Sequence, residues 1–203
     1  MSEKKDTFEA DLAFMRSLVS EGSRAEMSGG IVFLGAGLFY GLQCLVQWAD
    51  LVKLIRLNTF GHLSAAILPT VALLALVGWV MWRDRKQGPK GVATRALNAA
   101  FGSAGLANCF IVVVFGYWAL NEKSFLIWAL YPVVICAIQG AVWYTAYMIR
   151  KKIWLAGVSA GWFITTLVLG VLAKSPHYVL AIGIALIVLM SGSGLTMMKL
   201  AKK

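Results

Sequence analysis

Two histidines are the residues of this chain best suited to bind a metal or to respond to pH. His62 and His177 each stand at the start of a long apolar run. A neutral imidazole can ligate haem iron, copper or zinc, and its charge can change with the external pH. Haem, however, usually takes axial ligands from facing helices within the bilayer, and no third metal ligand converges with these two. We therefore expect two unrelated histidines and no cofactor, with a haem or metal site as an alternative.

Groups that could act as a general acid, a general base or a nucleophile are scarce. Outside the N-terminal segment the acidic residues are Asp50, Asp84 and Glu122, and each stands at the end of an apolar run. No two carboxylates are spaced for acid–base catalysis on one helix, and no nucleophile–base motif occurs. The three cysteines all fall inside apolar runs without a CxxC pair, which is typical of buried free thiols. The sequence therefore predicts a protein without enzymatic activity.

Two amides are the most distinctive polar groups within the apolar runs. Asn108 and Gln139 both fall near the middle of their runs, on consecutive helices that would be antiparallel. Their side chains could pair and set the register of that hairpin, a contact worth about 0.6 to 2 kcal/mol. Alternatively, the same two side chains could line a small polar cavity. The sequence is compatible with either arrangement of Asn108 and Gln139.

Six apolar stretches must position these residues. The chain has 203 residues, of which 60% are hydrophobic and 14% are charged, whereas soluble domains carry about 25% charged residues. A spanning helix needs about 20 apolar residues. Stretches of this length without Asp, Glu, Lys or Arg cover residues 31–49, 63–82, 96–120, 124–149, 153–173 and 175–198. The sequence predicts an all-α membrane protein with six transmembrane helices arranged as three hairpins.

The basic residues are distributed unequally between the two sides of such a protein. Fifteen of the 19 lysines and arginines fall in the N-terminal segment, the second and fourth loops and the C terminus. Short loops with this excess face the cytoplasm. We therefore expect both termini inside, in a multi-pass protein of the bacterial inner membrane. The same basic residues are expected to contact anionic membrane lipid, and direct binding of nucleic acid is not expected.

We expect residues 1–27 to form a separate cytoplasmic element ahead of the membrane domain, residues 28–203. Apolar residues recur there at helical spacing, which predicts an amphipathic helix over about 7–21 with a stop at Gly22. Six of the nine acidic residues of the chain also fall there, so the helix fits anionic lipid poorly. We expect it to pack on the basic loops of its own chain or to bind another protein. The predicted partner-binding residues are Phe8, Glu9, Asp11, Leu12, Met15 and Val19.

Small residues predict where helices approach one another closely. Gly37 and Gly41 are four residues apart, as are Gly157 and Gly161, and the last apolar run contains Ser191–Gly194. Two glycines at this spacing lie on one helix face and allow close backbone approach. We expect packing within the chain, with a homodimer surface as the alternative.

Several short segments resemble a pattern in uncharacterised proteobacterial inner-membrane proteins. These are DLAFMRSL at 11–18, EG at 21–22, SGG at 28–30, IWALYP at 127–132 and GAVW at 140–143. Some members of that family are encoded beside small winged-helix transcriptional regulators. The resemblance implies an inner-membrane protein with six helices and a cytoplasmic DNA-binding partner protein.

Three functional hypotheses follow. The first is a non-enzymatic regulatory or scaffold protein that binds a cytoplasmic protein partner through its N-terminal helix and basic loops. The second is a facilitator or channel for a small neutral or lipophilic solute. No Asp, Glu, Lys or Arg falls inside the six apolar runs, which argues against a proton-coupled transporter. The third is the haem- or metal-binding membrane protein that would use the two histidines.

Overall fold

The computed structural model describes the backbone of residues 2–85 and 91–202, and the side chains from Glu26 onward within these ranges. No strand occurs in these ranges. The helical elements are α1 (Ser2–Leu51), α2 (Thr59–Asp84), α3 (Val92–Asn121), α4 (Phe125–Arg150), α5 (Ile153–Leu172), α6 (Tyr178–Ala185), the π-helical turn η1 (Leu186–Ser191) and α7 (Gly192–Ala201).

The described residues contain six helical segments that are long and apolar enough to cross a membrane. The first is Glu26–Leu51 of α1, and the last is Tyr178–Ala201, in which α6, η1 and α7 run on as one helix. We call Tyr178–Ala201 the last span. The prediction of a multi-pass, all-α membrane protein with six spans is therefore confirmed.

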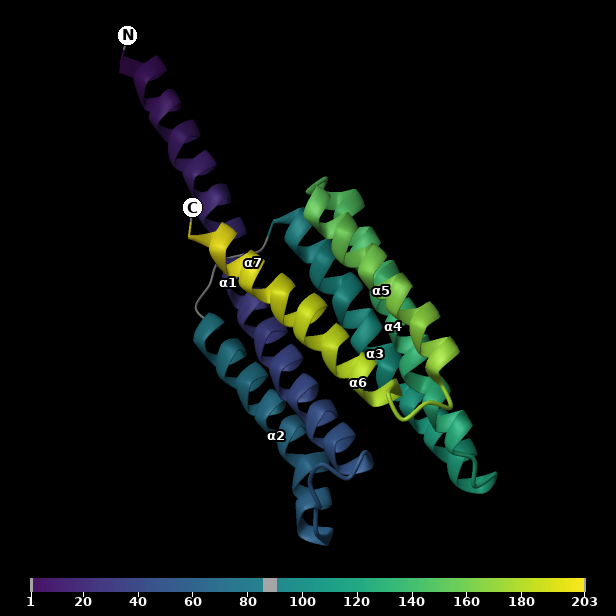
Figure 1. Cartoon of the computed structure of the whole chain (residues 1–203). Coiled ribbons are helices and arrows are strands. Elements are labelled where there is room, and N and C mark those ends of the chain that lie inside the picture. Colours follow the sequence, from purple (N-terminus) through teal and green to yellow (C-terminus); the bar gives the residue numbers. More distant parts are fainter. Residues whose placement is uncertain (1, 86–90, 203) are drawn as a thin grey trace.

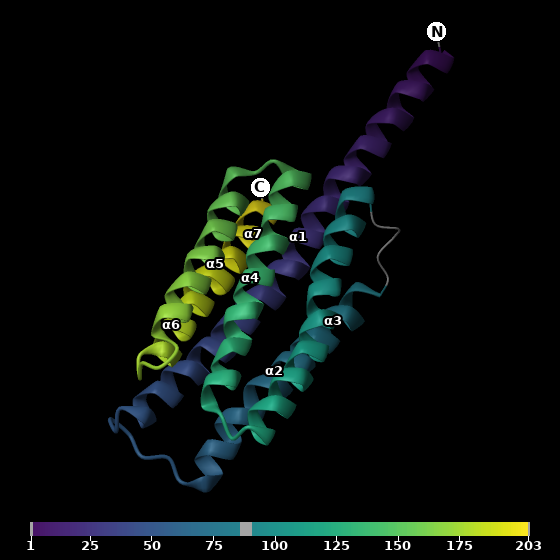
Figure 2. The ribbon, with the colours of Figure 1, turned by 90° about the vertical axis from the view of Figure 1, so that its right-hand side faces the viewer.

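The helices form a bundle in which the first and the last spans lie together. α1 packs against α2 on one side and against the last span on the other, as Figures 1 and 2 show. The last span then contacts α5, α5 contacts α4, and α4 contacts α3. α2 and α3 consequently lie at the periphery, where most of their apolar side chains are exposed to the surroundings.

Helix α1 continues well beyond the membrane bundle. Figure 1 shows residues 2–25 projecting from the bundle, past the C terminus, in line with the rest of α1. The predicted helix stop at Gly22 is wrong, because the helix passes through this residue without interruption. A glycine ends a helix by adopting a positive φ, and no described glycine of the chain does so.

Lysines in the left-handed conformation follow three of the helices. Lys53, Lys123 and Lys151 have φ values of 63°, 48° and 53°, just after α1, α3 and α4 respectively. A single residue in this conformation ends a helix and reverses the chain within a few residues. The Lys151 turn is the tightest, since α4 ends at Arg150 and α5 begins at Ile153. It therefore brings the ends of α4 and α5 together.

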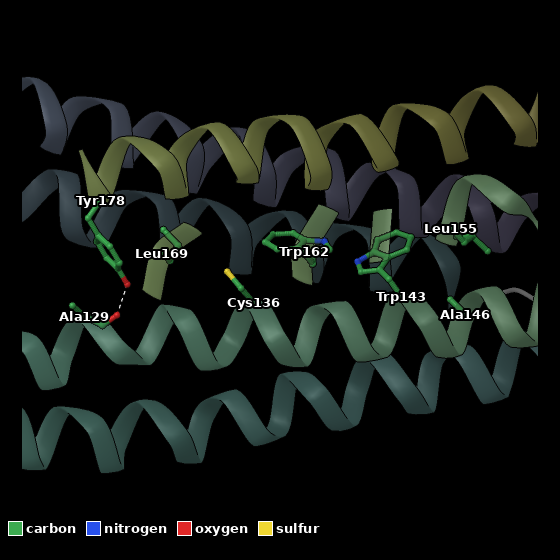
Figure 3. Packing of buried hydrophobic residues seen from close by; sticks show 8 residues of the cluster. All are labelled: Ala129, Cys136, Trp143, Ala146, Leu155, Trp162, Leu169 and Tyr178. Carbon is green, nitrogen blue, oxygen red and sulfur yellow. Dashed lines mark hydrogen bonds between the residues drawn. The ribbon is translucent and has the colours of Figure 1, made fainter. Parts of the chain in front are cut away.

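The core is a row of buried side chains that runs along α4, α5 and the start of the last span (Figure 3). Trp143, Trp162 and Leu169 belong to this row, and they are 1%, 3% and 0% exposed. At one end of the row the Tyr178 hydroxyl donates a hydrogen bond to the Ala129 carbonyl oxygen. The row fills the space between these helices with apolar side chains.

Small residues hold α1 against the last span, as predicted for Gly37, Gly41 and Ser191–Gly194. A Cβ atom added at Gly37 would lie 2.4 Å from Ser191 Oγ, and one at Gly41 would lie 2.5 Å from Ile187 Cγ1. The prediction is wrong for Gly157, which has no atom within 4 Å of an added Cβ, because it lies on the exposed face of α5. The close approach therefore involves α1 and the last span.

Candidate functional site

A buried carboxylate marks one end of the bundle. Glu26 is 8% exposed and lies where α1 enters the bundle. Its Oε1 atom accepts a hydrogen bond from Arg150 Nη1 and another, of 2.8 Å, from Lys152 Nζ. The Lys151 turn makes this possible, because it brings Arg150, before the turn, and Lys152, after it, to the same carboxylate. We call this end of the bundle the basic end.

A cavity of about 120 Å³ lies beside this ion pair. Five helical segments contribute to it, namely α1, α3, α4, α5 and α7. Its largest lining residues are aromatic: Phe33, Phe101, Trp143 and Trp154. The rings of Phe33, Phe101 and Trp143 contact one another pairwise, with centroids 5.1 to 5.2 Å apart. Trp154 extends this cluster at 6.1 Å from Trp143 in an edge-to-face arrangement.

Polar groups complete the lining of the cavity. Glu26, Thr94, Asn98 and Arg150 all reach it. The indole N–H of Trp154 is buried and has no hydrogen-bond partner within the described part of the chain. A buried donor without an acceptor costs about 1–3 kcal/mol, so it marks a place where a polar ligand atom would be favoured. The cavity thus combines aromatic walls with hydrogen-bond donors.

The indole N–H of Trp143 is also buried without a partner, and it belongs to the core. Figure 3 shows the nitrogens of Trp143 and Trp162 on the edges of the two rings that face each other. Both groups are donors, so they cannot satisfy one another. Trp143 therefore contributes a wall to the cavity, while its indole nitrogen lies on the ring edge that faces Trp162.

Glu26 was missed as a site residue by the sequence reasoning, which placed it among the acidic residues of the N-terminal segment. A signal for it existed, since that segment was expected to pack on the basic loops of the same chain. Arg150 and Lys152 belong to one of those loops, so this expectation is met for Glu26. The residue stands five positions before the first long apolar run, where a carboxylate can meet residues from other helix ends.

The six predicted partner-binding residues all precede Glu26 in the chain. Their backbone belongs to the projecting part of α1, and their side chains lie outside the described part of the structure. The predicted amphipathic face is formed by Phe8, Glu9, Asp11, Leu12, Met15 and Val19, and it stays a prediction.

The two intramembrane amides do not pair with each other. Asn108 Oδ1 instead accepts a hydrogen bond of 2.6 Å from the Tyr131 hydroxyl. Gln139 Oε1 is buried without a partner in the described part of the chain. Asn108 thus does link α3 to α4, but through a tyrosine, because the longer side chain of Tyr131 reaches across the helix pair. The predicted Asn108–Gln139 hydrogen bond is therefore wrong.

The two histidines lie at the end of the bundle opposite the basic end, and each has its own partner. His62 Nε2 lies 3.4 Å from Asp50 Oδ2, and His177 Nδ1 accepts a hydrogen bond of 3.4 Å from Trp48 Nε1. No group of three His, Cys, Asp or Glu residues suitable for a metal occurs among the described residues. Each imidazole therefore contacts a residue near the C-terminal end of α1.

We expect Arg150→Gln to lower the free energy of unfolding by about 1–2 kcal/mol. Removing one partner of a buried ion pair costs about 3–5 kcal/mol, and Lys152 on the same carboxylate oxygen offsets part of this cost. Thermal unfolding of the purified protein in detergent measures the change. Lys199→Gln is the matched control, since Lys199 is exposed in the last turn of α7 and is not among the described ion-pair partners of Glu26. Equal melting temperatures for the two variants would contradict the role of the ion pair.

No protein-family model matches the chain, and comparisons with characterised proteins and with solved structures likewise find no match. The geometry of the chain itself therefore carries the functional proposal.

Proposed function

We propose that this protein is a non-enzymatic membrane regulator or scaffold that binds a cytoplasmic protein partner through its N-terminal helix. One observation carries the proposal: α1 is a single helix from Ser2 to Leu51, and its first half projects beyond the basic end of the bundle (Figures 1 and 2). A helix presented in this way is accessible from several sides. It is also joined without a break to the membrane-spanning part of α1.

The composition of the projecting segment favours a protein partner. Phe8, Leu12, Met15 and Val19 recur at a spacing that places them on one face of a helix, and acidic residues stand between them. An apolar helix face is stabilised when it is buried against another apolar surface. An amphipathic helix in a hydrophobic groove is a recurrent mode of peptide recognition. The acidic residues favour a groove with a basic rim over an anionic lipid surface.

The orientation belongs to the same proposal. The excess of lysine and arginine at the basic end favours placing it, with both termini, in the cytoplasm of a bacterial cell, at the inner membrane. The partner would then be a cytoplasmic protein. The resemblance to proteins encoded beside winged-helix regulators favours a DNA-binding protein as that partner, held at the membrane by the projecting helix.

The alternative functions have weaker support. A facilitator would need a path through the bundle, but Trp143, Trp162 and Leu169 fill the space between α4, α5 and the last span. A haem protein would need two axial ligands that face one another, but His62 and His177 contact different residues of the α1 C terminus. Neither alternative is adopted here.

We expect the double substitution Leu12→Asp with Met15→Asp to abolish partner capture. Two charges on the apolar face would remain desolvated in a hydrophobic groove, which is costly. The measurement is in-cell crosslinking of the full-length protein in native membranes, followed by mass spectrometry of the captured proteins. Point variants are preferable to deletion of residues 1–27, because the deletion also removes Glu26 and its ion pair.

The matched control is Ala10→Asp with Ser17→Asp, which adds the same charge on the opposite face of the helix. This variant should keep the partner, and both variants should reach the membrane in equal amounts. Loss of partner capture in both variants would mean that the added net charge, and not the apolar face, causes the loss. Capture that is retained in both would contradict the proposed function.

A further inference from the structure

We propose that the cavity at the basic end binds a small planar carboxylate, of about the size of one aromatic ring. The cavity is the space beside Glu26 and Arg150 that Phe33, Phe101 and Trp154 enclose. This proposal goes beyond partner binding and does not depend on it, since none of the described lining residues belongs to the projecting part of α1.

The size of the cavity and its walls define the body of the ligand. A dry engineered cavity of about 150 Å³ accepts benzene. The cavity here measures about 120 Å³, which is somewhat smaller, so one ring or a chain of similar bulk is the upper limit for the body of a ligand. Its walls are aromatic rings inclined to one another by 52° to 75°. Rings arranged in this way offer both faces and edges, and a planar ligand can contact both favourably.

The charges around the cavity define the polar group of the ligand. Glu26 supplies one negative charge, while Arg150 and Lys152 supply two positive charges. The guanidinium of Arg150 has five N–H donors, and its ion pair with Glu26 uses Nη1. The remaining donors suit a carboxylate, which guanidinium binds with two parallel hydrogen bonds. The excess positive charge therefore favours an anion.

The unpartnered N–H of Trp154 points to the same chemistry. Trp154 lines the cavity, and its indole N–H is buried without an acceptor among the described residues. A carboxylate oxygen would satisfy it, whereas an ammonium group, which has only donors, would not.

An aromatic cage with a carboxylate can also bind an organic cation. Among the described residues the Glu26 carboxylate is the only acidic group that lines the cavity, and both Arg150 and Lys152 already hold its Oε1 atom. An ammonium ligand would have to compete with these two cations and would add a third positive charge. An organic cation is therefore disfavoured relative to an anion.

The test uses the purified full-length protein in detergent, with benzoate as the probe. Benzylamine and benzyl alcohol serve as cationic and neutral molecules of the same size. Isothermal titration gives the affinities, and the shift in melting temperature gives a second readout that requires no variant. We expect saturable binding of benzoate, at least about tenfold tighter than that of benzylamine, and a higher melting temperature with benzoate alone.

Two conservative variants locate the site. Trp154→Phe keeps an aromatic side chain, smaller by one ring, and removes the N–H. Arg150→Lys keeps the charge and removes the planar guanidinium that can form two parallel hydrogen bonds. Each should weaken benzoate binding by roughly tenfold. Trp128→Phe, on the exposed start of α4 at the opposite end, should leave it unchanged. Absence of saturable benzoate binding would overturn the proposal, as would tighter binding of benzylamine or unchanged affinity in both site variants.

Discussion

Replacing Gly194 by alanine should lower the free energy of unfolding by about 3 kcal/mol. The added Cβ atom would lie 2.5 Å from the Leu34 backbone nitrogen and 2.6 Å from the Gly30 carbonyl oxygen. These are backbone atoms of α1, so they cannot rotate away as a side chain would. The two helices must then separate, and overpacking of this kind typically costs about 1–3 kcal/mol, occasionally more.

Separation of α1 from the last span also removes dispersion contacts along both helices. Association of helices within a membrane depends on such close packing, because lipid offers no hydrophobic gain for helix pairing. Unfolding in mixed micelles of a mild detergent and dodecyl sulfate measures the change in free energy.

The matched control for this variant is Gly102→Ala. An added Cβ at Gly102 has no neighbouring atom within 4 Å, so the substitution adds helix propensity without a clash. We expect it to leave the stability unchanged or to raise it by up to about 1 kcal/mol. Equal stability of Gly194→Ala and the unsubstituted protein would contradict the close approach of α1 and α7.

Replacing Trp143 by alanine should also destabilise the fold by about 3–5 kcal/mol. Trp143 is 1% exposed and contacts Phe33, Phe101 and Trp154 through its ring. Large-to-small substitution of a buried aromatic residue leaves a cavity whose cost depends on how far the surroundings collapse. In a membrane the loss consists mainly of dispersion contacts, since lipid is as apolar as the core.

Trp82→Ala is the control for the Trp143 variant. Trp82 is 68% exposed on α2, and its replacement should change the stability by about 0.5 kcal/mol or less. The same unfolding assay compares the two variants. A similar loss in both would mean that tryptophan stabilises the protein through the membrane interface and not through the core row of Figure 3.

The six spans were predictable because they depend on local properties. The length and hydropathy of a segment decide whether it can cross a bilayer, whatever its neighbours are. The glycines at positions 37 and 41 were also interpretable, since their spacing places them on one face of a single helix. The same spacing at Gly157 and Gly161 proved ambiguous, because the rotation of α5 leaves Gly157 exposed while Gly161 meets Leu189.

Contacts between side chains of different helices were less predictable. Asn108 and Gln139 were matched by their depth in the membrane, but depth does not define the direction in which a side chain points. In the structure Asn108 accepts a hydrogen bond from Tyr131, one of the aromatic residues of α4, and Gln139 Oε1 has no hydrogen-bond partner among the described residues. The rotation of α3 and α4 about their axes decides such pairs, and many small packing contacts determine that rotation.

The two histidines, His62 and His177, illustrate the same distinction. Their placement at helix starts near the end opposite the basic end follows from the sequence, whereas their partners Asp50 and Trp48 follow from how the bundle packs. The cavity beside Glu26 is a still clearer case. It is built by residues of α1, α3, α4, α5 and α7, which only tertiary packing brings together. Hydropathy and charge by themselves determined a six-span membrane protein, while the packing of its helices decided where a ligand could bind.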